Sequence, residues 1–384
     1  MFLDPALLAR IRERAAGYDR DNTFFTEDFE ELKEAGYFTA MVPKEFGGPG
    51  LSLEDITREQ MALAGAAPAT ALAVNMHQVW MGVANTVYRT GDTSMNFMFE
   101  AAMAGHVFAF GVSEAGNDLV LFGSNSRAQA QEDGGYTFYG TKIFTSLSPG
   151  WTMLGTFGAE EGPDGEQVNV WGFVDRDSGV QIKDDWDTVG MRASQSCTTV
   201  LDGAYSPAER IVRRIPSGPS GDPFIFGIFA NFEILLASVY TGIGARALEV
   251  AVETVSKRTS KATGTTYSQD PAIRWRIADA AMEMDVLYPL IAQAARDVDA
   301  GVDRGSLWFP QLSNVKSQAT ETALRVVEKA VRVSGGSSYF NRSELSRLYR
   351  DVLAGLFHPS DDESVHGAWP MPCWGRLRGS SGAY

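Results

Sequence analysis

Two segments near the middle of the chain place small, hydroxylated and glycine residues directly after apolar strand patterns. The first is Val112-Ser-Glu-Ala-Gly-Asn-Asp118, and the second is Gly140-Thr-Lys-Ile-Phe-Thr-Ser146. Short hydroxyls and glycine backbone allow N–H and O–H donors to approach a flat polar ring system closely. We therefore expect these two strand edges to form a wall against a planar cofactor, rather than a metal pocket.

A different kind of chemistry is indicated by Glu233, the one carboxylate in the apolar stretch of residues 231–244. Burying an unpaired carboxylate is costly, so a buried Glu233 needs a functional reason. The alternative is a side chain that points to solvent or pairs with a structural arginine.

The composition argues against several classes of protein. A net charge of −15, from 48 acidic and 33 basic residues, is unlike that of a nucleic-acid-binding surface. The chain shows no apolar run of about 18 residues and no basic, then apolar, N-terminus, so we expect neither a membrane span nor a signal peptide. Two cysteines and four scattered histidines favour a cytoplasmic protein without a disulfide framework or zinc cluster.

Changes of pattern divide the chain into consecutive regions. Residues 1–105 show helical spacing, with Asp4 and Pro5 as the first helix start. Residues 106–214 hold short β-rich runs between turn residues, the spacing of an antiparallel β-domain rather than of βαβ units. After a linker at 215–223, residues 224–366 suit a helical bundle, and residues 367–384 are expected to form an irregular tail.

Five short motifs, in this order, together resemble those of the acyl-CoA dehydrogenase superfamily across nearly the whole chain. They are Pro43-Lys-Glu-Phe-Gly-Gly-Pro-Gly50, Ser113-Glu-Ala-Gly-Asn-Asp118, Gly140-Thr-Lys-Ile-Phe-Thr-Ser146, Gly190-Met-Arg-Ala-Ser-Gln-Ser196, and Gly335-Gly336 followed by Arg347-Leu-Tyr-Arg-Asp351. The second is a shortened form of the family's T-E-P-G-A-G-S-D motif. The resemblance implies an α+β fold: an N-terminal helical domain, a middle antiparallel β-domain and a C-terminal four-helix bundle.

The resemblance also implies that FAD binds between the β-domain and the bundle. Ser113 and Ser146 would donate hydrogen bonds to the polar edge of the isoalloxazine, where negative charge gathers on reduction. Phe144 stands where the family has a tryptophan packed on the ring, and Phe110 is assigned to the same cofactor contacts. Judged from the residues alone, the two serines could instead cap strand ends.

Three further residues are implied to contact the FAD phosphates. Arg258 matches an arginine that reaches the diphosphate of an FAD held mainly by a neighbouring subunit. Gly335 and Gly336 would let the backbone approach the diphosphate or adenosine. The alternatives are a cation at a helix C-terminus for Arg258 and a helix C-cap for the glycines. Arg347 and Asp351 are expected to form a structural salt bridge.

The catalytic base departs from the family pattern. The usual glutamate falls on Pro359 or Ser360, but some branches place it on the first bundle helix, where this chain has Glu233. Against Glu233, the arginine that commonly follows is Ile234 here. The segment just past the usual position supplies other candidates: His358, Asp361, Asp362 and Glu363.

Two activities follow from the resemblance, and a third interpretation is a helical scaffold without chemistry. The first activity is FAD-dependent α,β-dehydrogenation of an acyl-CoA thioester, with Glu233 as base and electrons passed to an electron-transfer flavoprotein. The second is a flavin-dependent monooxygenase that uses O2 and a flavin reductase; such members lack the glutamate and often carry a downstream histidine. We expect a homodimer or homotetramer, because the FAD site is shared between subunits.

Overall fold

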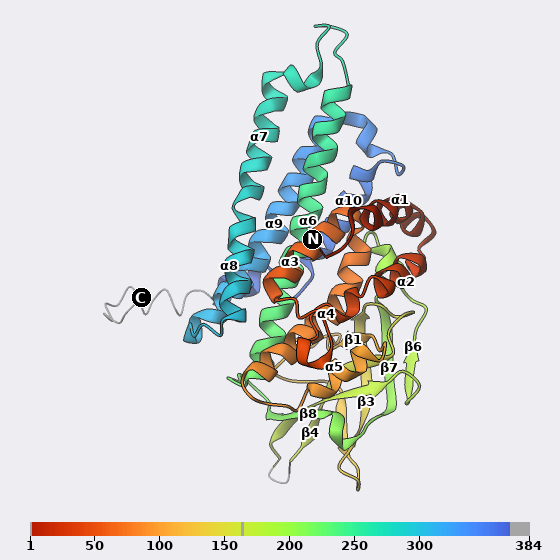
Figure 1. The fold of residues 1–384 in the computed structure, drawn as a ribbon, viewed down its shortest axis with the longest axis vertical. Coiled ribbons are helices and arrows are strands. Elements are labelled where there is room, and N and C mark those ends of the chain that lie inside the picture. Colours follow the sequence, from red (N-terminus) through yellow and green to blue (C-terminus); the bar gives the residue numbers. More distant parts are fainter. Residues whose placement is uncertain (1, 163–164, 369–384) are drawn as a thin grey trace, which may run out of the picture.

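The computed structural model describes residues 2–162 and 165–368. The first region is helical (Figure 1), with the helices α1 (Pro5–Asp21), α2 (Thr26–Glu34), α3 (Leu53–Ala66), α4 (Pro68–Arg89) and α5 (Asn96–Met103). Local sequence explains the helix starts: the Asp4 carboxylate accepts from the N–H of Ala6, and Ser52 and Asp55 form a reciprocal capping box.

The middle region is one eight-stranded sheet in the order β6-β7-β3-β2-β4-β5-β8, with β1 paired to β4. The strands are β1 (Phe108–Gly111), β2 (Arg127–Ala130), β3 (Tyr136–Thr145), β4 (Met153–Glu161), β5 (Gln167–Asp175), β6 (Val180–Ile182), β7 (Cys197–Ser206) and β8 (Ile211–Pro216). Most pairings are antiparallel, as expected, but β1–β4 and β2–β4 are parallel. Neither β1 nor β2 is joined to β4 by a hairpin turn, so each of them can pair with β4 in parallel.

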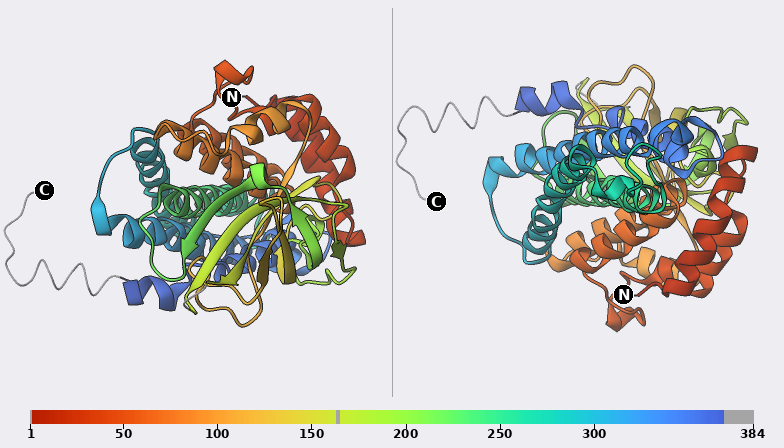
Figure 2. Two further views of the ribbon diagram at one scale, coloured as in Figure 1. Left: turned by 90° about the horizontal axis from the view of Figure 1, so that it is seen from below. Right: turned by 90° about the horizontal axis from the view of Figure 1, so that it is seen from above.

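The C-terminal region is helical again, with α6 (Pro223–Lys257), α7 (Pro271–Asp285), α8 (Leu287–Asp299), α9 (Trp308–Ser334), α10 (Glu344–Val352) and α11 (Asp362–Ala368). In Figure 1, α6, α7 and α9 run side by side, and α8 continues the line of α7. Seen from below in Figure 2, the sheet lies across one end of these helices and the N-terminal helices lie to one side. This arrangement confirms the predicted helical, β and helical order.

One tryptophan joins the three regions. Trp80 of α4 is buried and donates its indole N–H to the Ala109 carbonyl of β1 at 2.9 Å. Its ring lies 5.0 Å from that of Phe110 and 6.2 Å from that of Phe224 at the start of α6, measured between centroids. Because one packed cluster links the first helices, the sheet and α6, the positions of cavity residues from all three regions are fixed relative to one another.

Several boundaries differ from the prediction. Strand β8 extends to Pro216, into the predicted linker. Inside the predicted bundle, α7 and α8 are separate helices that meet at Val286. Helix α11 continues to Ala368, and the rest of the predicted tail, 369–384, lies outside the described residues. Within the described residues, α6 alone is long and apolar enough to cross a membrane, but 83% of its most apolar window is buried against the rest of the chain, as in a core helix.

Candidate active site

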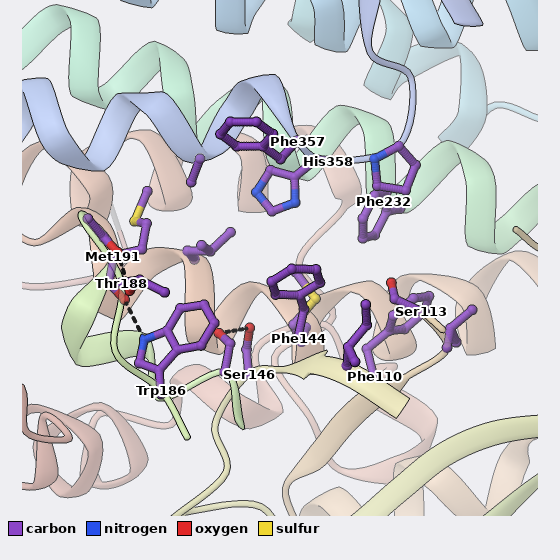
Figure 3. A pocket seen from close by; sticks show the side chains of 18 of the residues that line it. Phe110, Ser113, Phe144, Ser146, Trp186, Thr188, Met191, Phe232, Phe357 and His358 are labelled. Carbon is purple, nitrogen blue, oxygen red and sulfur yellow. Dashed lines mark hydrogen bonds between the residues drawn. The ribbon is translucent and has the colours of Figure 1, made fainter. Parts of the chain in front are cut away.

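The three regions meet around a cavity of about 470 Å³, within the size range of small-molecule sites. Figure 3 shows its main side chains: Phe144 lies between Ser146 and Ser113 on the sheet side, and Phe357 and His358 lie opposite. The lining also includes Phe110 from β1 and Phe232 from α6. Four predicted cofactor residues, Phe110, Ser113, Phe144 and Ser146, are thus brought to one cavity.

The sheet side of the cavity is a wall made by the ends of β1 and β3. The N–H of Ile143 donates to the Ser113 carbonyl at 2.9 Å, which ties the two motif segments together. The hydroxyl oxygens of Ser146 and Ser196 are 2.7 Å apart, so a hydrogen bond joins the motif at 190–196 to the motif at 140–146. Phe144 has a positive φ of 57°, an uncommon conformation for a non-glycine residue, and its side chain is 56% exposed.

A buried ion pair fixes the loop that leaves this wall. Lys142 and Glu114 are both buried, and their Nζ and Oε1 atoms are 2.6 Å apart. Glu114 also accepts hydrogen bonds from the hydroxyls of Ser124 and Ser126, and the Lys142 ammonium donates to the Phe157 carbonyl. These contacts fix the backbone of the second motif, residues 113–118, beside the cavity.

Opposite the wall, the segment after α10 carries a histidine. Nε2 of His358 lies 2.8 Å from the Tyr240 hydroxyl of α6. Burial, and then the charge of nearby Lys316, lower the pKa of His358 to about 3, so the imidazole is neutral at physiological pH. The neighbouring Phe357 is 80% exposed and lines the cavity.

Lys316 of α9 anchors the backbone of this histidine segment. Its ammonium donates to the carbonyls of Gly355, His358 and Ser360 at 2.9, 3.2 and 3.2 Å. Burial lowers the pKa of Lys316, although the Glu233 carboxylate opposes that shift. Sequence analysis missed Lys316 and Tyr240, because a lysine or tyrosine on a long helix carries no signal of what it will contact.

Glu233 lies behind this segment rather than in the cavity lining. It is fully buried, and one carboxylate oxygen accepts from the Ser360 hydroxyl at 2.6 Å. The other oxygen has no hydrogen-bond partner among the described residues. Burial raises the pKa of Glu233, against the opposing effects of the Ser360 hydrogen bond and the Lys316 charge.

The fourth and fifth motifs meet beside the cavity. A Cβ on Gly190 would lie 2.1 Å from the Arg350 carbonyl oxygen, so only glycine allows this approach. The N–H of Met191 donates to the Asp351 carboxylate at 2.6 Å. The predicted Arg347–Asp351 salt bridge is wrong: within the described chain Asp351 has this backbone partner instead, and no charged nitrogen of Arg347 lies within 4.0 Å of its carboxylate oxygens.

Arg258, Gly335 and Gly336 lie away from this chain's own cavity. Arg258 follows the last residue of α6, donates to the Ser334 carbonyl and stacks on Tyr267. Gly335, with a φ of 72°, ends α9, so the C-cap interpretation has direct support. The three residues are close together, since a Cβ on Gly335 would lie 3.2 Å from Nη1 of Arg258.

The cavity suits a flat, amphipathic ring system. Phe144 and Phe357 leave large apolar rings uncovered inside it, which is unfavourable unless a ligand covers them. Hydroxyls and backbone groups of Ser113 and Ser146 lie on the sheet side, where they could bond the polar edge of such a ring. These features fit an isoalloxazine.

Comparison with known proteins agrees with this geometry. The family described as acyl-CoA dehydrogenase, N-terminal domain, matches residues 7–106, and that described as acyl-CoA dehydrogenase, C-terminal domain, matches residues 234–362. L-evernosamine nitrososynthase of Micromonospora is 30% identical, with 91% of this chain and 84% of the relative covered. Putative acyl-CoA dehydrogenase YdbM of Bacillus subtilis is 27% identical, with 92% and 91% covered.

A solved structure shares the fold closely. KijD3 in complex with FMN and an amino-keto-sugar nucleotide superposes with a TM-score of 0.84, at 26% identity, covering 96% of this chain and 91% of the other. Fold and cavity together define a flavin-dependent oxidoreductase. The chain belongs to the acyl-CoA dehydrogenase superfamily.

Proposed function

We propose that this protein is a flavin-dependent monooxygenase that inserts one oxygen atom of O2 into a nitrogen, sulfur or aromatic carbon centre. Reduced FAD or FMN would supply the two electrons, and the second oxygen atom would leave as water. A flavin reductase is the partner this activity requires. The nitrososynthase relative supports the proposal, because a nitroso group is nitrogen bonded to oxygen.

The observation that carries the proposal is that the cavity lining holds His358 but not Glu233. The two carboxylates of the lining are already engaged: Glu114 pairs with Lys142, and Asp361 accepts from the Ser364 hydroxyl. Dehydrogenation requires a base in contact with the substrate's α-carbon. Glu233 is fully buried, bonded to Ser360 and outside the lining, whereas His358 lines the cavity opposite Phe144. A neutral imidazole can donate or accept a hydrogen bond at the reacting oxygen without placing a charge there.

Each group of side chains around the cavity has a separate role in the proposed reaction. Tyr240 holds Nε2 of His358, which leaves Nδ1 to form a hydrogen bond with a ligand. Ser113 and Ser146 orient the cofactor's polar edge, and Phe110 and Phe144 exclude water from one side. Lys316 positions the histidine segment through three carbonyls. Arg258, Gly335 and Gly336 would serve the cofactor phosphates of a neighbouring subunit, so the proposal includes a homodimer or homotetramer.

Acyl-CoA dehydrogenation with FAD, Glu233 as base and an electron-transfer flavoprotein as acceptor is the second candidate. The specific observation in its favour is the raised pKa of Glu233, since a carboxylate of high proton affinity is a competent base. The relative YdbM, described as a putative acyl-CoA dehydrogenase, points the same way. For this activity, Ser360 would have to move aside to expose the carboxylate.

A pair of assays on the flavin-loaded protein separates the candidates. In the first, oxidised flavin is titrated anaerobically with acyl-CoA thioesters of several chain lengths; we expect no loss of flavin absorbance. In the second, a flavin reductase, NADH and air are supplied with aromatic, sulfur and amine compounds, and oxygenated products are measured by mass spectrometry. We expect product from one class.

Glu233→Gln is the informative variant, with Asp361→Asn as matched control at the cavity edge. Oxygenation should survive in both variants. Bleaching of wild-type flavin by an acyl-CoA, abolished by Glu233→Gln and retained in Asp361→Asn, would establish the dehydrogenase instead.

A further inference from the structure

Trp186 turns into the cavity from a loop whose other side chains face water. It is the only apolar residue in Lys183-Asp-Asp-Trp-Asp187, and the four charged residues around it are all exposed. No helical or strand periodicity would place such a residue in a core. Its indole nevertheless lines the cavity, beside Ser146 on the sheet side (Figure 3). A large aromatic ring that leaves a charged surface loop to face a cavity points to a ligand.

Trp186 and Phe144 form a right-angled aromatic corner at the sheet wall. Their ring centroids are 6.2 Å apart and their planes are inclined at 87°. A planar ligand that lies parallel to one of these rings stands perpendicular to the other, and it can therefore gain a stacked contact and an edge contact together. Phe144 is 56% exposed, so one ring of the corner is open to such a ligand.

The indole offers the cavity aromatic area rather than a hydrogen bond. Its N–H already donates to the Met191 carbonyl at 3.3 Å, and an indole has no other polar group. The backbone carbonyl of Trp186 accepts from the side-chain amide of Asn22 at 2.7 Å. Both the ring and the backbone of Trp186 are thus held by the protein, and what remains for a ligand is an apolar ring in a fixed orientation.

Asn22 holds this loop from the end of α1. It caps that helix in the left-handed conformation, with φ 51° and ψ 46°, which asparagine tolerates better than most residues. Its own carbonyl accepts from the Gln195 side-chain amide at 3.0 Å, and the Asp19 carbonyl accepts from Nε of Arg192 at 2.9 Å. The end of α1 therefore fixes both parts of the connection between β6 and β7, the part that carries Trp186 and the turn before Ser196.

We propose that Trp186 binds the isoalloxazine ring together with Phe144, and that Asn22 is the positioning residue that keeps the indole in place. The cofactor is the expected occupant because Trp186 lies beside Ser146, whereas Phe357 and His358 lie across the cavity (Figure 3). The proposal rests on the flavin of the proposed function, but it is the same for oxygenation and for dehydrogenation.

Titration of the flavin-free protein with riboflavin and with FMN, followed by flavin fluorescence, tests the contact without turnover. Trp186→Leu should weaken the binding of both by about ten-fold, and by the same factor, because the lost contact is with the ring and not with the phosphate. Trp186→Phe keeps an aromatic ring and should lose less. Trp275→Leu makes the same change at a tryptophan of α7 that is 76% exposed, and it should bind as wild type does.

A double-mutant cycle tests the role of Asn22. Asn22→Asp removes the amide donor but keeps a residue that accepts the left-handed conformation, so riboflavin binding should weaken by about three- to ten-fold, the value of one hydrogen bond. Combined with Trp186→Leu, the same substitution should cost no further affinity, because Asn22 acts through the indole. Equal losses in both backgrounds would show that Asn22 serves only the fold.

Three results would overturn the assignment of Trp186. Riboflavin affinity unchanged in a Trp186→Leu protein that circular dichroism shows to be folded would exclude the ring contact and leave the flavin itself in place. A loss of affinity for FMN alone would move Trp186 to the phosphate. Unchanged flavin affinity with a raised substrate KM would move it to the substrate. If wild type binds neither riboflavin nor FMN, this inference and the proposed function fail together.

Discussion

At the scale of single residues, the site is decided by which polar group faces the cavity. His358 and Glu233 are both close to residues 359–360, where the family's usual base is expected. His358 lines the cavity, whereas Glu233 is buried behind it. Two hydrogen-bonding side chains produce this outcome: Tyr240 holds the imidazole, and Ser360 holds the carboxylate. Small rearrangements of one segment would exchange their roles.

Replacing His358 by alanine should therefore lower the yield of oxygenated product per reduced flavin by about 10²-fold, the usual contribution of one positioned hydrogen-bond donor. Flavin affinity should change little, since the ring lies opposite the sheet wall. Tyr240→Phe removes only the bond that orients the ring and should cost about ten-fold. An oxygen electrode follows O2 consumption and the hydrogen peroxide released without product, and chromatography measures the oxygenated product.

The pH profile of the same reaction is a further check on His358. Its lowered pKa, about 3, keeps the ring neutral, so the turnover rate should show no titration attributable to this ring between about pH 5 and 8. A wild-type inflection near the ordinary histidine value that disappears in His358→Ala would contradict this expectation.

At the scale of elements, the cavity wall depends on how one loop is anchored to one strand. The loop from Glu114 to Ser126 begins at the end of β1 and is closed by the Lys142 ammonium of β3. Burial alone would raise the pKa of Glu114, but the charge and hydrogen bond of Lys142 lower it to about 2. The Lys142–Glu114 ion pair thus keeps Asn117 and Val120 in the cavity lining.

Lys142→Met should destabilise the fold by about 3–5 kcal/mol, because it leaves Glu114 buried without its counter-charge. The double variant with Glu114→Gln should lose much less, since no isolated charge remains. Urea denaturation measures both. A double variant as unstable as Lys142→Met would show that the cost arises from packing rather than from charge.

The same pair predicts an acid sensitivity. Because the folded pKa of Glu114, about 2, is below its ordinary value of 4.5, its contribution is complete above pH 4.5 and is lost as the pH falls towards 2. As the pH is lowered from 4.5 to 2, the urea concentration at the unfolding midpoint should therefore decrease more steeply for wild type than for the double variant.

At the scale of the whole molecule, two groups of predicted cofactor residues are separated. Ser113, Phe144 and Ser146 line the cavity, whereas Arg258 and Gly335 meet at the far ends of α6 and α9. A homo-oligomer resolves the separation if each subunit lends its arginine to a neighbour's flavin.

Co-expression of Arg258→Gln with His358→Ala, each subunit carrying a different tag, tests this arrangement. Both parent variants should be nearly inactive, but a mixed dimer purified through both tags should contain one site with intact Arg258 and intact His358. Its activity should approach half that of wild type. Mixed dimers no more active than the parents would place Arg258 in the service of its own subunit.

The sequence by itself determined the order of regions, because hydrophobic periodicity and capping residues are local properties. Asp4 with Pro5 and Ser52 with Asp55 start helices as their types require. It also indicated the two hydroxyl-bearing segments at the ends of β1 and β3, because an apolar run that ends in small hydroxylated residues is a local pattern.

Tertiary structure alone decided which side chains share a cavity. Lys316 reaches the histidine segment, and arginines from α1, from the turn at 192–194 and from residues 342–350 line one cleft, through contacts between residues far apart in the sequence. No local pattern encodes such convergence, because it depends on how packed helices and the sheet set the directions of long side chains. For the same reason, the seclusion of Glu233 behind Ser360 became visible only in the folded chain.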